Sequence, residues 1–166
     1  MQKLSAKYIG LIGGALMVVV FLLMFYSFHQ PENGKVQYAC YGIYTAAIII
    51  ALIRFKASPS PVERSFKDYF SEGFKAFVVM VLIMAVFTFI FYKLNPQIID
   101  NHLAEVNKYN VQDTNKTPAE LADNTKQLKN IFIPMTVGIT TVMYLIIGAL
   151  VTLVGAGLLS QKSNNR

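Results

Sequence analysis

Apolar residues gather along this chain into four long stretches that contain no Asp, Glu, Lys, Arg or His. They occupy residues 8–28, 36–53, 76–92 and 131–160. At 1.5 Å per helical residue, each stretch covers about 25 Å or more, close to the ~30 Å hydrocarbon core of a bilayer. Backbone polar groups inside lipid must be paired within their own segment, which favours helices. The pattern predicts an all-α protein, a polytopic four-helix transmembrane bundle, with spans at about residues 8–28, 36–55, 74–94 and 131–160.

The polar segments between these spans are too short for an independent globular domain. We therefore expect residues 1–166 to form a single four-span membrane domain, with one loop at 56–73 and a larger one at 95–130. The segment 54–75 and the two ends of the chain hold nine Lys and Arg residues, and the segments on the opposite side hold six. Basic residues are enriched in cytoplasmic loops. This asymmetry predicts a multi-pass protein in the lipid bilayer with both termini and the loop 56–73 in the cytoplasm.

The net charge of +6 does not indicate nucleic-acid binding, because the charge follows the predicted sides of the membrane. Under the same orientation the cytoplasmic segments carry +6 and the extracytoplasmic segments carry zero. A charge sorted in this way is accounted for by membrane orientation. We expect no nucleic-acid partner.

The cytoplasmic loop contains an amphipathic aromatic segment ahead of the third span. Ser60-Pro61-Val62-Glu63 has the residues of a helix start, with Ser at the cap and Pro at the first helical position. Such a helix could lie in the headgroup layer, attract anionic lipid, dock a partner, or simply lead into the span. The candidate residues for the membrane interface are Arg64, Phe66, Lys67, Phe70 and Phe74.

The extracytoplasmic loop, residues 95–130, contains two further helix starts. Asn95-Pro96 is one, and Thr117-Pro118-Ala119-Glu120 is a capping box with Pro at the first helical position. Apolar residues follow each start at helical spacing: Ile99, Leu103 and Val106, then Leu121 and Leu128. We expect an extracytoplasmic helical hairpin between the third and fourth spans. Segments that lie flat in the headgroups or stay flexible are the alternatives.

Small residues recur along three of the spans at spacings that let helices approach closely. On the fourth span they alternate every three and four residues, as along one helix seam. The same stripes could pack within the bundle or against a second copy or another membrane protein. The candidate helix-packing residues are Gly10, Gly14, Gly42, Ala46, Gly138, Thr141, Gly148, Thr152 and Gly155.

Side chains with catalytic or metal-binding chemistry are sparse. His102 and Glu105 lie three apart on one helix, but two ligands do not complete a metal site. Cys40 is the only cysteine and is expected to pack as a small apolar residue. With no nucleophile–base pair to assign, we expect no enzyme activity, no catalytic residue, no metal and no cofactor.

The spans also lack the ionisable side chains that proton- and ion-coupled carriers use. The predicted function is that of a non-enzymatic scaffold or accessory subunit that acts through helix packing and the outer hairpin. The alternative is an oligomeric small transporter or channel lined by hydroxyl side chains, for which Thr136, Thr140, Thr141 and Thr152 would be the lining.

The order of short motifs resembles a bacterial membrane protein family. The segment from Ser65 to Lys75 precedes the third span, Tyr92-Lys93-Leu94-Asn95-Pro96 ends it, and Thr117-Pro118-Ala119-Glu120-Leu121 opens the helix before the last span. In this order the chain is similar to the family known as domain of unknown function 4199. The resemblance implies an integral protein of the bacterial cytoplasmic (inner) membrane and brings no catalytic residue.

Overall fold

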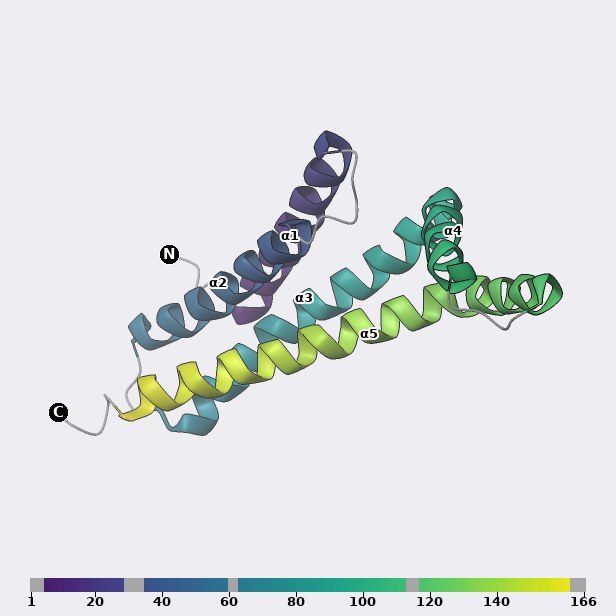
Figure 1. Ribbon diagram of the computed structural model, residues 1–166. Coiled ribbons are helices and arrows are strands. Elements are labelled where there is room, and N and C mark those ends of the chain that lie inside the picture. Colours follow the sequence, from purple (N-terminus) through teal and green to yellow (C-terminus); the bar gives the residue numbers. More distant parts are fainter. Residues whose placement is uncertain (1–4, 29–34, 60–62, 113–116, 162–166) are drawn as a thin grey trace. The chain divides into compact units, whose positions relative to one another are not determined.

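The regular structure of the protein is helical throughout the part that is described. The computed structural model describes residues 5–28, 35–59, 63–112 and 117–161. In these ranges it contains five helices: α1 (Ala6–Phe28), α2 (Lys35–Ala57), α3 (Phe66–Leu94), α4 (Pro96–Gln112) and α5 (Pro118–Gln161) (Figure 1). Of these, α1, α2, α3 and α5 are long and apolar enough to cross a membrane. The all-α class and the four spans are confirmed.

Two of the three expected helix starts occur where the sequence places them. The backbone N–H and the hydroxyl of Thr117 both donate hydrogen bonds to the Glu120 carboxylate, at 2.8 and 2.9 Å. The Glu120 N–H in turn donates to the Thr117 hydroxyl at 3.4 Å. These bonds form the predicted capping box before α5. Helix α4 begins at Pro96, directly after Asn95, as expected.

The start predicted at Ser60 is wrong. Residues 60–62 lie outside the described residues, but 63–65 are not helical and α3 begins at Phe66. The cap is Ser65, whose N–H and hydroxyl each donate to the Asp68 carboxylate at 2.8 Å. Ser65 and Asp68 have the same three-residue spacing as a capping box, so the chain holds two competing start signals within a few residues. The one nearer the apolar stretch forms the helix.

Helices α3 and α5 are each continuous across segments that the sequence analysis divided. The aromatic segment expected to lie ahead of the third span is the first part of α3, with no turn between them. Helix α5 has 44 residues, which is about 66 Å at 1.5 Å per residue and about twice the hydrocarbon thickness. Its first part, residues 118–130, carries the charged side chains and the rest is uncharged. The polar part of α5 therefore extends beyond the length that a membrane needs.

The chain divides into two compact units. Unit 1 comprises Met1–Met84 and Thr141–Arg166, and unit 2 comprises Ala85–Thr140. Unit 1 holds α1, α2, the larger part of α3 and the end of α5. Its innermost side chains come from α1, α2, α3 and α5: Met17, Tyr44, Ile48, Leu52, Phe77, Met80 and Thr152 are all essentially inaccessible.

Unit 2 contains the end of α3, all of α4 and the first part of α5. Its buried cluster is small and consists of Ile99 and Leu103 from α4 and Phe132 from α5. Tyr92, Leu128 and Ile133 pack against the cluster. The apolar side expected for the first helix of the hairpin is thus the side of α4 that is buried, with Ile99 and Leu103 at its centre.

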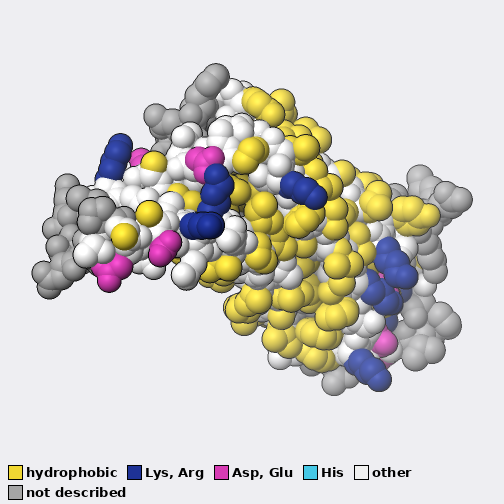
Figure 2. Space-filling model, turned by 90° about the vertical axis from the view of Figure 1, so that its right-hand side faces the viewer, with side chains coloured by type: hydrophobic (Ala, Val, Ile, Leu, Met, Phe, Trp, Pro, Cys, Tyr) yellow, Lys and Arg dark blue, Asp and Glu magenta, His cyan; other side chains and the backbone are white. Residues whose placement is uncertain are grey.

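Large apolar side chains also cover the outside of the spanning helices. Figure 2 shows hydrophobic side chains gathered over much of the face that it presents. Leu11 and Leu23 of α1, Leu82 of α3 and Val154 of α5 are each more than half exposed. Exposed apolar surface on this scale is costly in water and is the surface that lipid covers. These helices therefore belong in a bilayer.

Candidate functional site

The glycines of α1 provide the closest approach between two helices in unit 1. A Cβ atom on Gly10 would collide with the backbone carbonyl oxygen of Ala76 on α3. A Cβ on Gly14 would lie 2.6 Å from Cδ1 of Ile83 on the same helix. Two of the predicted packing residues therefore face α3. The backbone obstacle at Gly10 cannot rotate away, so this position tolerates only hydrogen.

Gly13 joins this contact, although the sequence analysis passed over it. A Cβ there would lie 2.8 Å from Sδ of Met80 and 3.0 Å from Cβ of Ala47. Gly13 thus meets both α3 and α2. The prediction rests on the four-residue spacing of Gly10 and Gly14, and Gly13 does not fit that spacing.

On α5, Gly148 makes room for a tyrosine of α2. A Cβ on Gly148 would collide with the hydroxyl of Tyr44 and would lie 2.7 Å from Cγ of Phe77. The Tyr44 hydroxyl donates a hydrogen bond of 2.7 Å to the backbone carbonyl of Tyr144. A buried hydroxyl without a partner costs about 1–3 kcal/mol, so the missing side chain at Gly148 lets Tyr44 reach its acceptor. We call Tyr44, Phe77, Tyr144 and Gly148 the tyrosine contact.

Further along α5, two predicted packing residues fit the neighbouring helices. Thr152 is completely buried, and a Cβ on Gly73 of α3 would lie 2.5 Å from its Cγ2. The Thr152 hydroxyl has no hydrogen-bond partner among the described residues. Gly155 faces α2, where a Cβ would lie 2.5 Å from Cδ1 of Leu52. Thr152 is thus enclosed against α3 within unit 1.

The remaining predicted packing residues lie elsewhere. Nothing approaches within 4 Å of a Cβ placed on Gly42 or Gly138. Both glycines are exposed, as is Ala46, and Thr141 is half-buried. The structure therefore brings Gly10, Gly14, Gly148, Thr152 and Gly155 into helix contacts and leaves Gly42, Ala46 and Gly138 on the outside. For these three, a contact with a second copy or a partner stays a prediction.

Arg64, one of the candidates for the membrane interface, has contacts with the end of α2. Its guanidinium donates to the backbone carbonyl of Phe55 and, at 2.6 and 2.9 Å, to the carbonyl and hydroxyl of Ser58. It also lies 4.3 Å from the centre of the Phe55 ring. The last carbonyl groups of a helix lack partners within that helix. Arg64 donates hydrogen bonds to carbonyl groups at the end of α2 and so contributes to the stability of the fold.

The other candidates for the membrane interface form a row along the start of α3. Phe66, Phe70 and Phe74 follow one another at four-residue intervals, with ring centres 6.1 and 6.3 Å apart. Phe66 and Phe74 are exposed, and Phe70 is half-buried. Lys67 is exposed beside them. Aromatic rings next to a lysine are typical of the region where a spanning helix leaves the hydrocarbon.

Unit 2 holds α4 and α5 together with polar contacts around its apolar cluster. The Asn107 amide donates to the Thr125 hydroxyl at 2.9 Å. Lys129 forms an ion pair with Asp100, and both side chains are about half exposed. Together these two contacts join α4 and α5 as a polar rim beside the apolar cluster, although the exposed ion pair by itself contributes little to stability. The remaining faces of both helices carry exposed polar residues.

The residues with metal-binding or nucleophilic chemistry are dispersed. The His102 ring lies edge-on to Phe132 with ring centres 5.6 Å apart. Cys40 is buried in α2 with its thiol 3.8 Å from the Met17 carbonyl oxygen. Among the described residues there is no group of three or more His, Cys, Asp or Glu side chains that could hold a metal ion. The candidate site of this protein is therefore its set of close contacts between helices.

Comparison with known proteins agrees with a membrane protein that has no assigned activity. A family model described as protein of unknown function (DUF4199) matches residues 8–161. No curated protein matches the chain, and no solved structure matches it. The match extends over all four candidate spans and over unit 2.

Proposed function

The chain belongs to the DUF4199 family of proteins of unknown function, and we propose that it acts as a non-enzymatic scaffold or accessory subunit in the bacterial cytoplasmic membrane. In this proposal the four spans anchor the protein in the membrane. The part of unit 2 between the third and fourth spans, residues 95–130, forms a helical hairpin outside the cytoplasm and presents a docking surface to a partner protein. The packed polar rim of unit 2 is the observation that carries the proposal.

The polar rim supports docking because a protein that is only anchored in the membrane does not need two packed helices between its spans. A short loop would be enough to connect two spans, yet this chain has a 17-residue α4 and a capped start to α5. Helices of this length are marginal alone and need a packed face. The Asn107–Thr125 bond and the apolar cluster supply one. The opposite faces, with exposed Asn101, Asp123 and Asn124, are then held in fixed positions.

The orientation in the proposal follows from charge. Nine basic residues lie on the side of the chain ends and six on the side of unit 2, which places unit 2 outside the cytoplasm under the positive-inside rule. Reporter fusions test this placement. We expect an active cytoplasmic reporter at residue 166 and an active periplasmic reporter at residue 113. The reverse pattern would contradict the proposed orientation.

The scaffold role is tested by site-specific photo-crosslinking in intact membranes. A photoreactive phenylalanine analogue at Asp123, on the exposed face of α5, should capture one protein species of defined size. The same analogue at Leu82, an exposed apolar position on α3, is the matched control and should give only lipid adducts. Capture from both positions, or from neither, would remove unit 2 as a docking surface.

Reconstitution of the purified chain separates this proposal from an oligomeric transporter or channel. We expect liposomes that contain only this protein to show no conductance and no solute flux above protein-free liposomes. Flux that disappears on substitution of the α5 threonines would overturn the scaffold proposal in favour of a pore. The complete burial of Thr152 against Gly73 argues against such a lining, because its hydroxyl does not face outward.

A further inference from the structure

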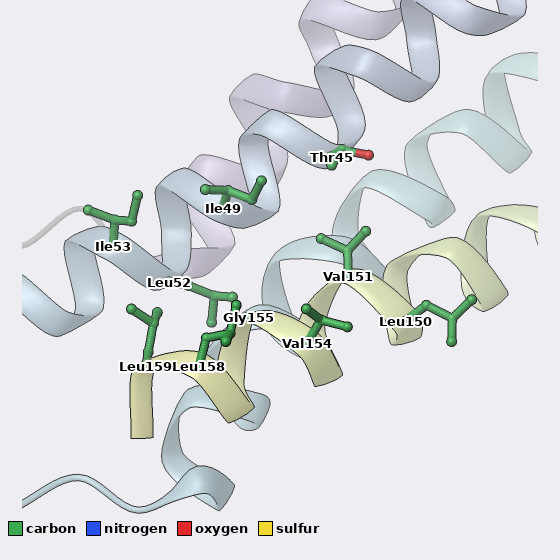
Figure 3. A pocket seen from close by; sticks show the side chains of 10 residues that line it. All are labelled: Thr45, Ile49, Leu52, Ile53, Leu150, Val151, Val154, Gly155, Leu158 and Leu159. Atoms are coloured by element: carbon green, nitrogen blue, oxygen red, sulfur yellow. The ribbon is translucent and has the colours of Figure 1, made fainter. Parts of the chain in front are cut away.

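An apolar groove runs between α2 and α5 in unit 1. Figure 3 shows side chains from both helices around it, and the oxygen of Thr45 is the only polar atom among the side chains drawn. Its volume is about 520 Å³, within the range of sites that hold small ligands. The groove is open to the surroundings. Its lining residues are Thr45, Ile49, Leu52 and Ile53 of α2, and Leu150, Val151, Val154, Gly155, Leu158 and Leu159 of α5.

Gly155 helps to form this groove. It belongs to the lining, and a Cβ there would lie 2.5 Å from Cδ1 of Leu52 across the groove. Beyond that contact the two helices leave room between them, because Ile49 and Val154 remain exposed at 44% and 62%. The groove is therefore a gap between two helices that are in contact at Gly155 and Leu52. At membrane depth such a gap is filled by hydrocarbon, since water would find almost no polar partner there.

A basic residue lies at one end of the same stripe of α2. Thr45, Ile49 and Leu52 line the groove at spacings of four and three residues, and Lys56 follows four residues later. Residues at these spacings share one face of a helix. Lys56 is thus about one turn, roughly 6 Å, beyond Leu52 along the helix axis. Lysine side chains near the end of a span extend toward the headgroup layer.

The charge of Lys56 is not neutralised within the described residues. The ion pairs found there join Lys75 to Glu72 and Lys129 to Asp100, and neither involves Lys56. Asp68 accepts its hydrogen bonds from Ser65. Lys56 is half-buried, and Arg54, the residue after the groove residue Ile53, adds an exposed cation near the same end of α2.

We propose that this groove binds an anionic phospholipid, with one acyl chain along the apolar lining and the phosphate next to Lys56. The lining matches an acyl chain, since about 12 Å of α2 from Thr45 to Ile53 is apolar apart from one hydroxyl. The lysine matches the negative headgroup. The inference requires only that the protein is embedded in a membrane and is independent of the scaffold role.

The chain offers a sensitive test because it contains no tryptophan. A single tryptophan at Val154 would report on the groove, and one at Leu82, which is equally exposed at 61% against 62%, would report on ordinary lipid contact. The full-length protein is reconstituted in phosphatidylcholine vesicles. Dibrominated phosphatidylglycerol or dibrominated phosphatidylcholine is then added in increasing proportion, and quenching of tryptophan fluorescence is measured. Leu150→Trp is a second groove reporter.

We expect the groove tryptophan to be quenched at an about fivefold lower fraction of phosphatidylglycerol than of phosphatidylcholine, the size of effect for one lysine at an anionic headgroup. Lys56→Gln should abolish this preference, and Lys67→Gln, a matched charge removal on α3, should retain it. Leu82→Trp should show no preference. Equal quenching by both lipids at Val154 would overturn the proposal, and so would absence of quenching there, which would mean that a second copy or a partner helix covers the groove.

Discussion

The two units of this protein use opposite kinds of side chain where their helices meet. In unit 1, helices approach at Gly10, Gly14 and Gly148, where a single added carbon would strike a neighbouring helix. In unit 2, α4 and α5 meet through the larger side chains of Leu103 and Phe132. Spanning helices gain nothing from moving apolar groups out of lipid, so close backbone packing has to hold them together. For the part of unit 2 that we propose lies outside the bilayer, burial of large apolar groups away from water is favourable.

This contrast has a practical consequence for mutagenesis. Unit 1 should be sensitive to added volume, because its contacts already lack space. Unit 2 should be sensitive to removed volume, because its cluster is small and each side chain carries a large share of the buried area. If both units lost the same stability on added and on removed side-chain volume, their helix contacts would be of the same kind.

The largest effect is expected for Gly148→Leu in the tyrosine contact. The new side chain would displace both Tyr44 and Phe77, and we expect a loss of about 3 kcal/mol, the upper end of the usual cost of overpacking. Unfolding in mixed detergent micelles measures the loss. Gly157→Leu is the matched control on the same helix, since nothing lies within 4 Å of a Cβ there. Equal losses for the two variants would contradict the close packing at Gly148.

A smaller and local effect is expected for Leu103→Ala in unit 2. Leu103 is 5% exposed in a cluster of three buried residues, so we expect a loss of about 2 kcal/mol, at the low end for such truncations. Amide exchange should quicken across α4 and the start of α5 while α1 and α2 keep their protection. Leu94→Ala is the control, because Leu94 is 73% exposed. Faster exchange throughout unit 1 would show that the units unfold together.

Removal of the helix cap by Thr117→Ala should destabilise the start of α5 by about 1 kcal/mol. The substitution deletes the hydroxyl that donates to Glu120 and accepts from its N–H. Amide exchange at residues 119–125 measures the change, and Thr117→Ser should restore protection because it keeps the hydroxyl. If Ala and Ser behaved alike, the capping box would not contribute to stability.

The smallest effect is expected for the ion pair between Asp100 and Lys129. Both side chains are about half exposed, and exposed pairs contribute about 0.2–1 kcal/mol. A double-mutant cycle with Asp100→Asn and Lys129→Gln should give a coupling near the lower figure, falling further in high salt. A coupling well above 1 kcal/mol would mean that unit 2 excludes water from this pair, and so that it is buried in lipid or against a partner.

Local signals predicted the helices of this protein well. The uncharged stretches gave the four spans because length and polarity alone decide what a bilayer accepts. Thr117 and Glu120 predicted their capping box because a cap involves only residues three apart. The error at Ser60 has the same origin: Ser65 and Asp68 offer an equivalent cap, and spacing alone could not choose between them.

The contacts between helices required the tertiary structure. The sequence marked Gly42 and Gly148 alike as small residues in spans, yet only Gly148 lies against another helix. Arg64 is a candidate for the membrane interface by its sequence, and only the structure shows that its guanidinium binds the end of α2. Which face of a helix meets a neighbour depends on the orientation of both helices, and residues such as Tyr44 and Tyr144 lie 100 positions apart. The sequence by itself therefore determined which segments are helices and which of them suit a membrane. Which helix faces meet, and where the groove beside Lys56 lies, depends on how the helices pack, so only the tertiary structure shows it.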